Sequence, residues 1–439
     1  MKRAARCALR WLNVALAVAS AGAWCTAGAE TLAEAWQLAV ARDKALAAAE
    51  SDVQGAQAAE RAARAARWPS LDASATYARL NASPTLDVTT PEGSTLRSGP
   101  IFKGDQIVSG SVQMKLPLYA GGQISAGIDA AQRNLVGASA EEQSARSLLK
   151  LDVAEAYVGV LRARRALQAV SASVESLAAH AADVQHMVER DLTPKSDLLA
   201  ARVALANAEQ DRVRTANSVE IAQAAYNRRL GEPLERSPQL DEQIPGDVLL
   251  KAIPVGALIG RALTSRNEIP AQAARADALA SQARVESGKV LPQLALIGGY
   301  THFDNQILDR QDFSAIGVGF TWNLFDGGQA RSRAAALRNA SRAAENRLED
   351  LRSRIELQVR QAWLDVQAAQ ARAKATGEAV AQADENLRSS RELYGAGLAT
   401  NTQVLNAVTL QVDAINNRDN ATLDESLSLL RLEFAVGAL

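Results

Sequence analysis

Few residues of this chain belong to the types that carry enzyme chemistry. The sequence contains three histidines and two cysteines in 439 residues. His180 and His186 are six positions apart, so they do not share a helix face as an i,i+4 metal-binding pair would, and His302 stands alone beside an expected strand. No phosphate-binding loop ending in Gly-Lys-Ser/Thr is present. The sequence therefore predicts no enzymatic activity, no cofactor and no metal site.

The two cysteines, Cys7 and Cys25, lie in a segment that has the features of a secretory signal peptide. An apolar stretch from about residue 11 to residue 23 follows four basic residues, and the small residues Ala27-Gly28-Ala29 suit a cleavage site. We therefore expect residues 1–29 to be removed. A lipidated Cys25 at the mature N-terminus is the alternative, which the bulky Trp24 before it disfavours.

Removal of this segment leaves 44 basic residues against 49 acidic ones, since the segment holds four of the 48 basic residues and no acidic one. A mildly acidic chain gives no reason to expect a nucleic-acid partner. Beyond the leader no apolar run reaches about 18 residues, so any membrane crossing would have to use strands.

A Gly-Gly pair occurs twice in the same context. Residues 118–123 read Leu-Tyr-Ala-Gly-Gly-Gln and return at 324–329 as Leu-Phe-Asp-Gly-Gly-Gln, a displacement of 206 positions. Each pair follows an alternating apolar run and precedes a heptad pattern, so Gly121, Gly122, Gly327 and Gly328 are interpreted as strand-to-helix turns. We expect a first repeat at 30–237, a linker at 238–254 and a second repeat at 255–439.

Alternating apolar and polar residues predict two β-hairpins, one in each repeat. A membrane-crossing strand needs about 9–11 residues, and aromatic residues gather near its ends. The pattern fits a soluble sandwich equally well, and four strands cannot close a membrane barrel of eight or more without oligomerisation. A loop at roughly 81–104 separates the first two runs and is 17 residues longer than its counterpart, since the flanking matches are displaced by 223 and 206 positions. The runs are Trp68–Tyr77, Ser109–Tyr119, Leu291–Tyr300 and Phe313–Phe325, and the candidate membrane-interface aromatics are Tyr77, Tyr119, Tyr300, Trp322 and Phe325.

Heptad patterns behind the Gly-Gly pairs predict very long helices. Apolar residues recur at alternating spacings of four and three from Leu149 to Val188, and a related pattern runs from Ile355 to Tyr394. Each helix would span about 68–70 residues, or roughly 100 Å at 1.5 Å per residue. Helical lead-ins are expected at 31–67 and 255–290. Return helices should begin near Thr400 and at Thr193-Pro194, with the proline in the first helical position.

This ordered set of elements resembles the TolC-type outer-membrane efflux proteins over essentially the whole mature chain. The resemblance implies a mainly α fold with some β, in which a homotrimer forms a 12-stranded outer-membrane β-barrel continued by a periplasmic α-helical barrel. It further implies contact with outer-membrane lipid, and an exit duct of a tripartite efflux or type I secretion system with a periplasmic adaptor protein and an inner-membrane pump as partners.

The resemblance also implies a gate at the periplasmic tip. Asp197 and Tyr394 match a hydrogen-bonded pair that helps to hold the tip closed, and Gln403 and Asn406 fall where well-studied members carry two aspartates. Ala399 replaces an arginine of the family's lock, and Lys195 is a candidate to offset Asp197 at the opening.

Structural roles compete with each of these gate assignments. Asp197 stands in a helix's first turn, where a carboxylate is favourable in any case. Tyr394 continues the heptad pattern, and Gln403 stands three positions after Thr400, as in a capping box. A coiled-coil scaffold or adhesin of the cell envelope, without a pore, is the alternative function. The sequence leaves open whether the substrate is a drug, a metal, another small molecule or a protein.

Overall fold

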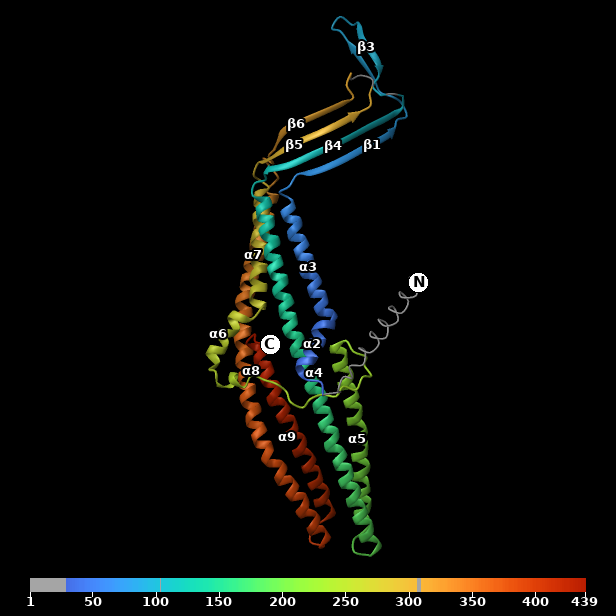
Figure 1. The fold of residues 1–439 in the computed structure, drawn as a ribbon, viewed down its shortest axis with the longest axis vertical. Coiled ribbons are helices and arrows are strands. Elements are labelled where there is room, and N and C mark those ends of the chain that lie inside the picture. Colours follow the sequence, from blue (N-terminus) through green and yellow to red (C-terminus); the bar gives the residue numbers. More distant parts are fainter. Residues whose placement is uncertain (1–28, 103, 306–308) are drawn as a thin grey trace, which may run out of the picture. The chain divides into compact units, whose positions relative to one another are not determined.

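The computed structural model describes residues 29–102, 104–305 and 309–439 (Figure 1), so both cysteines and nearly all of the expected leader lie outside the described residues. The described chain forms two compact units. The helical unit contains residues up to 43 together with 148–255 and 360–439, and the sheet unit contains 44–147 and 256–359. Each unit takes segments from both expected repeats. No helix in the described part of the chain is both long and apolar enough to cross a membrane.

Four antiparallel strands form the main sheet of the sheet unit, in the order β1-β4-β5-β6 (Figure 1). The two expected hairpins are therefore present, and pairing between β4 and β5 joins them. The strands are β1 (Ser70–Arg79), β4 (Gln106–Tyr119), β5 (Gln293–Phe303) and β6 (Asp312–Thr321).

Strand register separates the sheet into an apolar and a polar face. Leu71 pairs with Met114, which is opposite Gly298, which in turn faces Ile316, so these residues share the apolar face. Leu71 is 72% exposed and Ile316 is 78% exposed, because no element of the described chain covers this side. The polar face carries Ser70, Asp72, Ser74 and Thr76 from β1, and Ser111, Gln113 and Lys115 from β4.

The expected loop at roughly 81–104 contains two further strands, so the interpretation of the whole segment as a loop was wrong. β2 (Thr85–Thr89) and β3 (Thr95–Pro100) pair antiparallel. Gly93 lies between them with a φ of 85°, and the Gly93 N–H donates to the Thr90 carbonyl at 2.9 Å. The composition rich in Pro, Gly, Ser and Thr is typical of the turn, and pairing between β2 and β3 supplies backbone hydrogen bonds on either side of it.

Both helical lead-ins are broken where the sequence predicts continuous helices. Asp43 adopts an extended conformation with ψ of 127° and divides α2 (Leu32–Arg42) from α3 (Lys44–Ala65). In the second half, a break at 266–267 divides α6 (Val255–Ser265) from α7 (Glu268–Gly288). The three- and four-residue spacing of apolar residues hides each break, because an interruption of one or two residues scarcely disturbs the apolar periodicity.

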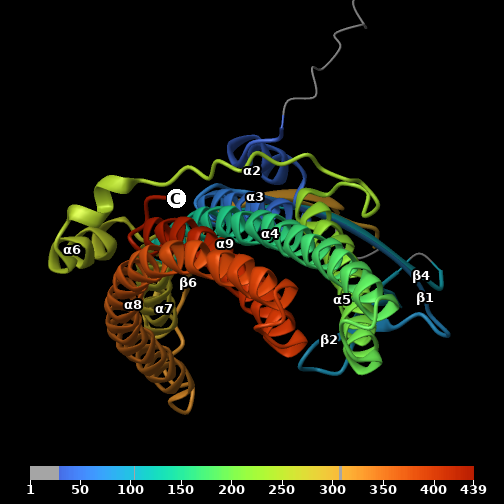
Figure 2. The ribbon, with the colours of Figure 1, turned by 90° about the horizontal axis from the view of Figure 1, so that it is seen from below.

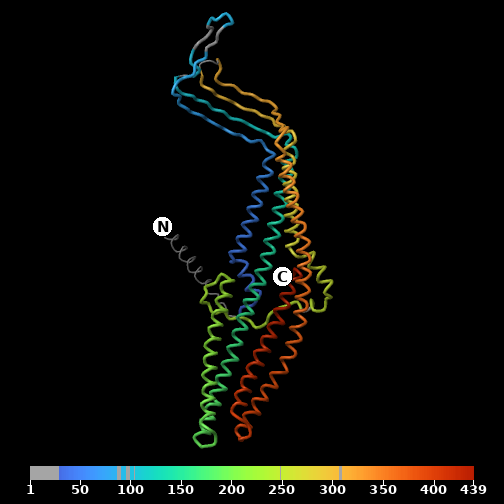
Figure 3. Tube along the Cα trace, turned by 180° about the vertical axis from the view of Figure 1, so that it is seen from behind, coloured from blue at the N-terminus to red at the C-terminus, as the bar shows by residue number. Residues whose placement is uncertain are grey.

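Both long helices have 67 residues, close to the expected length: α4 (Gln123–Glu189) and α8 (Gln329–Gly395). They turn back into α5 (Lys195–Leu230) and α9 (Asn401–Ala435) at the same end of the helical unit (Figure 2 and Figure 3). Pro194 is the N-cap residue of α5 and not its first helical residue, which corrects the expected start by one position.

The two turns at this end have the same backbone geometry. The Leu192 N–H donates to the Met187 carbonyl at 2.9 Å, and the Leu398 N–H donates to the Leu393 carbonyl at 2.8 Å. The residue before each leucine is left-handed: Asp191 at φ 56° and Gly397 at φ 75°. Both helices therefore end in a Schellman-type cap, and aspartate occupies in the first copy the position that glycine occupies in the second.

The heptad residues form the core of the helical unit. Val153, Val160 and Val184 of α4 are fully buried, and Val366 of α8, the counterpart of Val160, is only 3% exposed. A coiled-coil pattern buries one stripe of each helix and leaves the opposite side polar.

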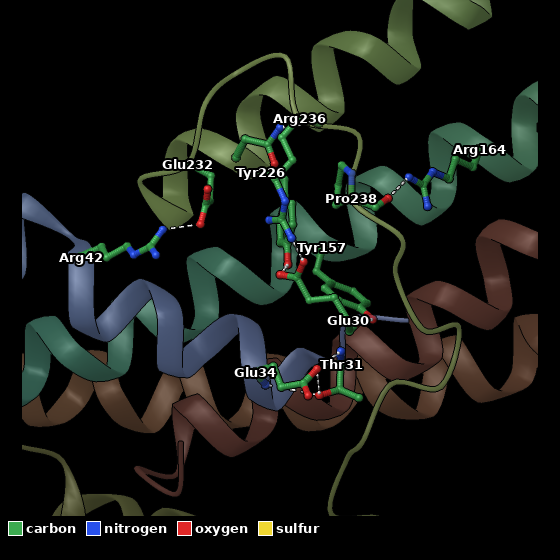
Figure 4. Close-up of polar contacts among 11 residues, drawn as sticks. Glu30, Thr31, Glu34, Arg42, Tyr157, Arg164, Tyr226, Glu232, Arg236 and Pro238 are labelled. Atoms are coloured by element: carbon green, nitrogen blue, oxygen red, sulfur yellow. Dashed lines mark hydrogen bonds and ion pairs between the residues drawn. The ribbon is translucent and has the colours of Figure 1, made fainter. Parts of the chain in front are cut away.

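The start of the described chain is held against α4 and α5 by a cluster of polar contacts (Figure 4). The Glu30 carboxylate accepts hydrogen bonds from the Tyr226 hydroxyl at 2.7 Å and from Arg236 at 2.5 Å. The Tyr157 hydroxyl lies 2.8 Å from the Glu30 carbonyl and 2.7 Å from that of Asp241. We call these five residues the Glu30 clamp. Burial raises the pKa of Tyr157 to about 12, with the nearby Asp241 carboxylate adding to the shift.

The linker between the expected repeats packs within the helical unit. Residue 240 forms a parallel bridge with Glu30, and a short 3₁₀ helix, η1 (Val248–Ala252), follows. Lys251 of η1 forms an ion pair with Glu425 of α9 at 2.9 Å.

Gly121 and Gly327 occupy equivalent turns but have different surroundings. Both are left-handed, at φ 59° and 65°. A Cβ on Gly121 would lie 2.6 Å from the Gly288 carbonyl oxygen and 2.8 Å from Leu291 Cβ, whereas a Cβ on Gly327 would meet nothing within 4 Å.

We therefore expect Gly121→Ala to destabilise the sheet unit more than Gly327→Ala does. Both changes incur backbone strain of about 1–2 kcal/mol, and only Gly121→Ala adds steric overlap, at a typical cost of about 1–3 kcal/mol. Thermal unfolding of the detergent-purified variants measures the difference. Equal unfolding temperatures would show that the close approach of Gly288 has no energetic consequence.

Candidate functional site

Two helical hairpins pack against each other at the end of the helical unit where the long helices turn. The apolar part of this contact is formed by buried residues from all four helices. They are Leu177 and Val184 of α4, Leu198 of α5, Leu387 and Tyr394 of α8, and Val404, Ala407 and Val408 of α9. The hairpins α4–α5 and α8–α9 are therefore joined by a small hydrophobic core close to their turns.

A hydroxyl–carboxylate cluster lies beside this core. The Thr193 hydroxyl donates to Asp197 Oδ2 at 3.1 Å, and the Tyr394 hydroxyl donates to the same oxygen at 3.4 Å. The two hydroxyl oxygens are 3.3 Å apart. Asp197 and Tyr394, which the sequence predicts as a pair, do meet, although the 3.4 Å separation makes their hydrogen bond a weak one.

A second polar connection crosses between the hairpins through Asn401. Asn401 Nδ2 donates to the backbone carbonyl of Asp197 at 3.0 Å, and Asn401 Oδ1 lies 2.7 Å from His180 Nε2. Because the amide oxygen can only accept, the His180 Nε2 atom carries the proton in this arrangement. His180 is only 4% exposed, and its ring packs against Tyr394 with centroids 5.5 Å apart. The polar tip cluster thus consists of His180, Thr193, Asp197, Tyr394 and Asn401.

The electrostatics of the tip cluster keep Tyr394 neutral. Burial raises the pKa of the Tyr394 phenol, the Asp197 carboxylate raises it further, and the hydrogen bond with Thr193 opposes the shift. A protonated phenol can donate to Asp197, whereas a phenolate would face a carboxylate across a short distance. The arrangement can therefore hold the two hairpins together throughout the neutral pH range.

The other sequence-predicted tip residues lie outside this cluster. Gln403 Oε1 accepts a hydrogen bond from the Thr400 N–H at 2.8 Å, and the Gln403 N–H donates to the Thr400 hydroxyl at 3.4 Å, which completes a capping box at the start of α9. Asn406 and Lys195 are exposed, and within the described residues Lys195 forms no ion pair. Ala399 packs against the hydrophobic core of the tip.

Sequence reasoning missed His180, Thr193 and Asn401. His180 lies beside the apolar heptad stripe of α4, where a solvated histidine and a buried one leave the same pattern. Asn401 is the first residue of α9, where polar residues are common for capping reasons alone. The repeat offers no guide either, because Asn386 and Lys195, the residues 206 positions away, make no equivalent hydrogen bond with the described part of the chain. Only the packing of the two hairpins brings these side chains together.

The five candidate interface aromatics are exposed on the sheet unit. Tyr300 donates to Asp312 at 2.6 Å, and Trp322 Nε1 donates to the Val290 carbonyl at 3.1 Å. Tyr77, Tyr119 and Phe325 also expose much of their surface. Exposed tyrosine and tryptophan rings, whose O–H and N–H groups can contact water, are typical of protein surfaces at a membrane–water boundary.

Comparison with known proteins identifies the family. The family model described as "Outer membrane efflux protein" matches residues 35–232 and 258–438, which together make up most of the chain. Outer membrane protein TolC of Vibrio cholerae is 25% identical over 437 residues, covering 98% of this chain and 94% of that protein.

Solved structures share the fold at low sequence identity. The outer membrane protein VceC of Vibrio cholerae superposes with a TM-score of 0.77 at 21% identity, covering 92% of this chain and 96% of VceC. The CmeC outer membrane channel of Campylobacter jejuni gives a TM-score of 0.80 at 15% identity, covering 93% and 85% of the two chains. The chain therefore belongs to the outer membrane efflux protein family and is an outer-membrane channel protein that extends into the periplasm.

Proposed function

We propose that three copies of the chain form one exit duct, with twelve strands closing a barrel in the outer membrane and the helices continuing it into the periplasm. The two free edges of the main sheet carry this proposal. Within the described residues, β1 and β6 each pair on one side only. Unpaired backbone groups in hydrocarbon cost several kcal/mol each, so β6 of one copy must pair with β1 of the next.

Strand direction and strand number both agree with this closure. The four strands alternate in direction, so β6 and the β1 of a neighbouring copy meet antiparallel. Three copies supply twelve strands, an even number within the range of bacterial outer-membrane barrels. The exposed apolar face would contact lipid, and the polar face would line water.

Engineered cysteines test the closure directly, because the mature chain is expected to contain none. We expect Ser74→Cys on β1, combined in turn with Phe313→Cys, Ala315→Cys or Gly317→Cys on β6, to give a disulfide-linked ladder up to the trimer in at least one combination. Non-reducing electrophoresis of outer membranes measures this. Ser74→Cys with Thr301→Cys, which lies across the interior strand β4, is the control.

Purified wild-type protein should also conduct ions in planar bilayers. A monomer without conductance would refute the proposal.

The tip cluster is proposed to hold the periplasmic end closed at rest. Apart from the Thr193–Asp197 bond, each of its hydrogen bonds crosses from one hairpin to the other. Separation of the hairpins, as on docking of a periplasmic adaptor, must break all of these together. An inner-membrane pump would supply the energy for transport, and the duct itself would conduct passively. Whether its cargo is a small molecule or a secreted protein does not follow from these contacts.

We expect Asp197→Ala to raise the open probability of single channels. The change removes the carboxylate that accepts from both Thr193 and Tyr394, and net hydrogen-bond energies of about 0.5–1.5 kcal/mol correspond to a shift of roughly two- to tenfold in the closed-to-open ratio per protomer. Lys195→Ala, an exposed residue two positions earlier, is the matched control and should leave gating unchanged. Wild-type open probability in Asp197→Ala would remove Asp197 from the lock.

We further expect the duct to resist block by trivalent cations from the periplasmic side. If Gln403 and Asn406 line the passage, they present neutral amides where the resemblance to the family implies two aspartates, so attraction for multivalent cations at the tip is weak. Lanthanum titration of the bilayer current measures this. Gln403→Asp with Asn406→Asp should create block, since a carboxylate three positions after Thr400 remains compatible with the start of α9. Block of the wild type at low micromolar lanthanum would contradict the prediction.

A further inference from the structure

The polar face of the main sheet carries very little charge. Following the register across the four strands, Asp72 of β1 and Lys115 of β4 are the only charged residues of the described strands that lie on this face. Asp72 is opposite Gln113 and Lys115 is opposite Ser70, so they are diagonal neighbours on adjacent strands. They form no ion pair among the described residues, and both are exposed. The remaining residues are mostly small: serine, threonine, alanine and glycine.

Lys115 lines a hollow of about 480 Å³ at the end of the sheet where the strands meet the helices. It is the only charged residue of the lining. Ser70, Gln293 and Thr321 supply uncharged polar groups, and Gln123 contributes from the first turn of α4. A single ammonium group among neutral donors has the chemistry of a site for one anionic group.

The other wall of the hollow is apolar and shaped by a glycine. Pro117, Ala295 and Ile297 lie on the polar face and line the hollow together with Lys115. A Cβ on Gly319 would come within 2.5 Å of Ile297 Cδ1, so glycine at this position is what allows the Ile297 side chain to lie across β6. A residue with a side chain there would push Ile297 out over the hollow.

We propose that this hollow, which we call the Lys115 site, is an anion-selecting subsite of the duct that favours organic anions with an apolar portion. The inference rests on the proposed function, in which the polar face lines the duct. The carboxylate or phosphate of the permeating molecule contacts the Lys115 ammonium group, and its apolar portion lies against Pro117, Ala295 and Ile297. Three copies place three Lys115 ammonium groups around one passage, with three Asp72 carboxylates beside them on the same face. Asp72 does not line the hollow, so Lys115 is the charged group that sets the sign of the preferred ion within it.

Reversal potentials across planar bilayers test whether the charge of Lys115 sets the ion selectivity. In a potassium chloride gradient, Lys115→Gln should shift the reversal potential towards that of potassium, and Lys115→Glu should shift it further. Lys115→Arg keeps the charge and should retain the wild-type value, which separates charge from folding. Asp72→Asn is the matched control on the neighbouring strand and should shift the potential in the opposite direction.

Bi-ionic measurements with potassium hexanoate on one side and potassium chloride on the other test the apolar wall. Ile297→Ser should lower the hexanoate-to-chloride permeability ratio and leave the potassium-to-chloride ratio as in the wild type.

A conducting Lys115→Gln channel with an unchanged reversal potential would overturn this inference and leave the trimeric duct intact. Absence of conductance in the wild-type protein would instead refute the proposed function.

Discussion

A strand edge placed in hydrocarbon must find a hydrogen-bonding partner, and this requirement governs how the rest of the molecule is organised. One copy of the chain provides four strands with two open edges and an uncovered apolar face. Such a sheet is unstable as a monomer, because its open edges and its apolar face would be exposed in water and its edges would be unpaired in lipid. Left-handed glycines at both strand-to-helix turns connect the sheet directly to the long helices. On the proposed closure by neighbouring copies, the helices would therefore also be arranged around a common axis.

The two helical hairpins are held together at the tip by few and individually weak contacts. Its hydrophobic core is small, and the polar contacts beside it are either long, as between Tyr394 and Asp197, or made to a neutral amide, as between His180 and Asn401. On the proposal that the tip cluster holds the duct closed, net energies of about 1 kcal/mol for such bonds would let a docking protein open it without unfolding the hairpins. The capping box of Thr400 and Gln403 stays within α9, so helix structure at the turn does not depend on closure.

Elements with a regular apolar period could be predicted from the sequence, whereas side-chain contacts between those elements could not. The heptad residues from Leu149 to Val188 revealed α4 almost to its last turn, and alternation revealed all four strands of the sheet, because burial of one face imposes a regular pattern. Local features left no such pattern: the extended Asp43 between α2 and α3, Pro194 as a cap, and the short β2–β3 hairpin inside a turn-rich segment. His180 and Asn401 meet across 221 positions, a distance over which local patterns carry no information.

The Glu30 clamp has a consequence for the order in which the polypeptide assembles. Glu30 precedes Tyr226 by 196 positions and Arg236 by 206, so its carboxylate has no partner until almost half of the chain beyond it has been synthesised. The entropic cost of closing so large a loop rises only slowly with its length, but contacts of high sequence separation form slowly. Until α5 and the following segment arrive, the charge of Glu30 remains hydrated, whereas the Tyr157 hydroxyl can already reach the Glu30 carbonyl. The first residues of the described chain thus reach their native positions only after the segment from Tyr226 to Asp241 has been made.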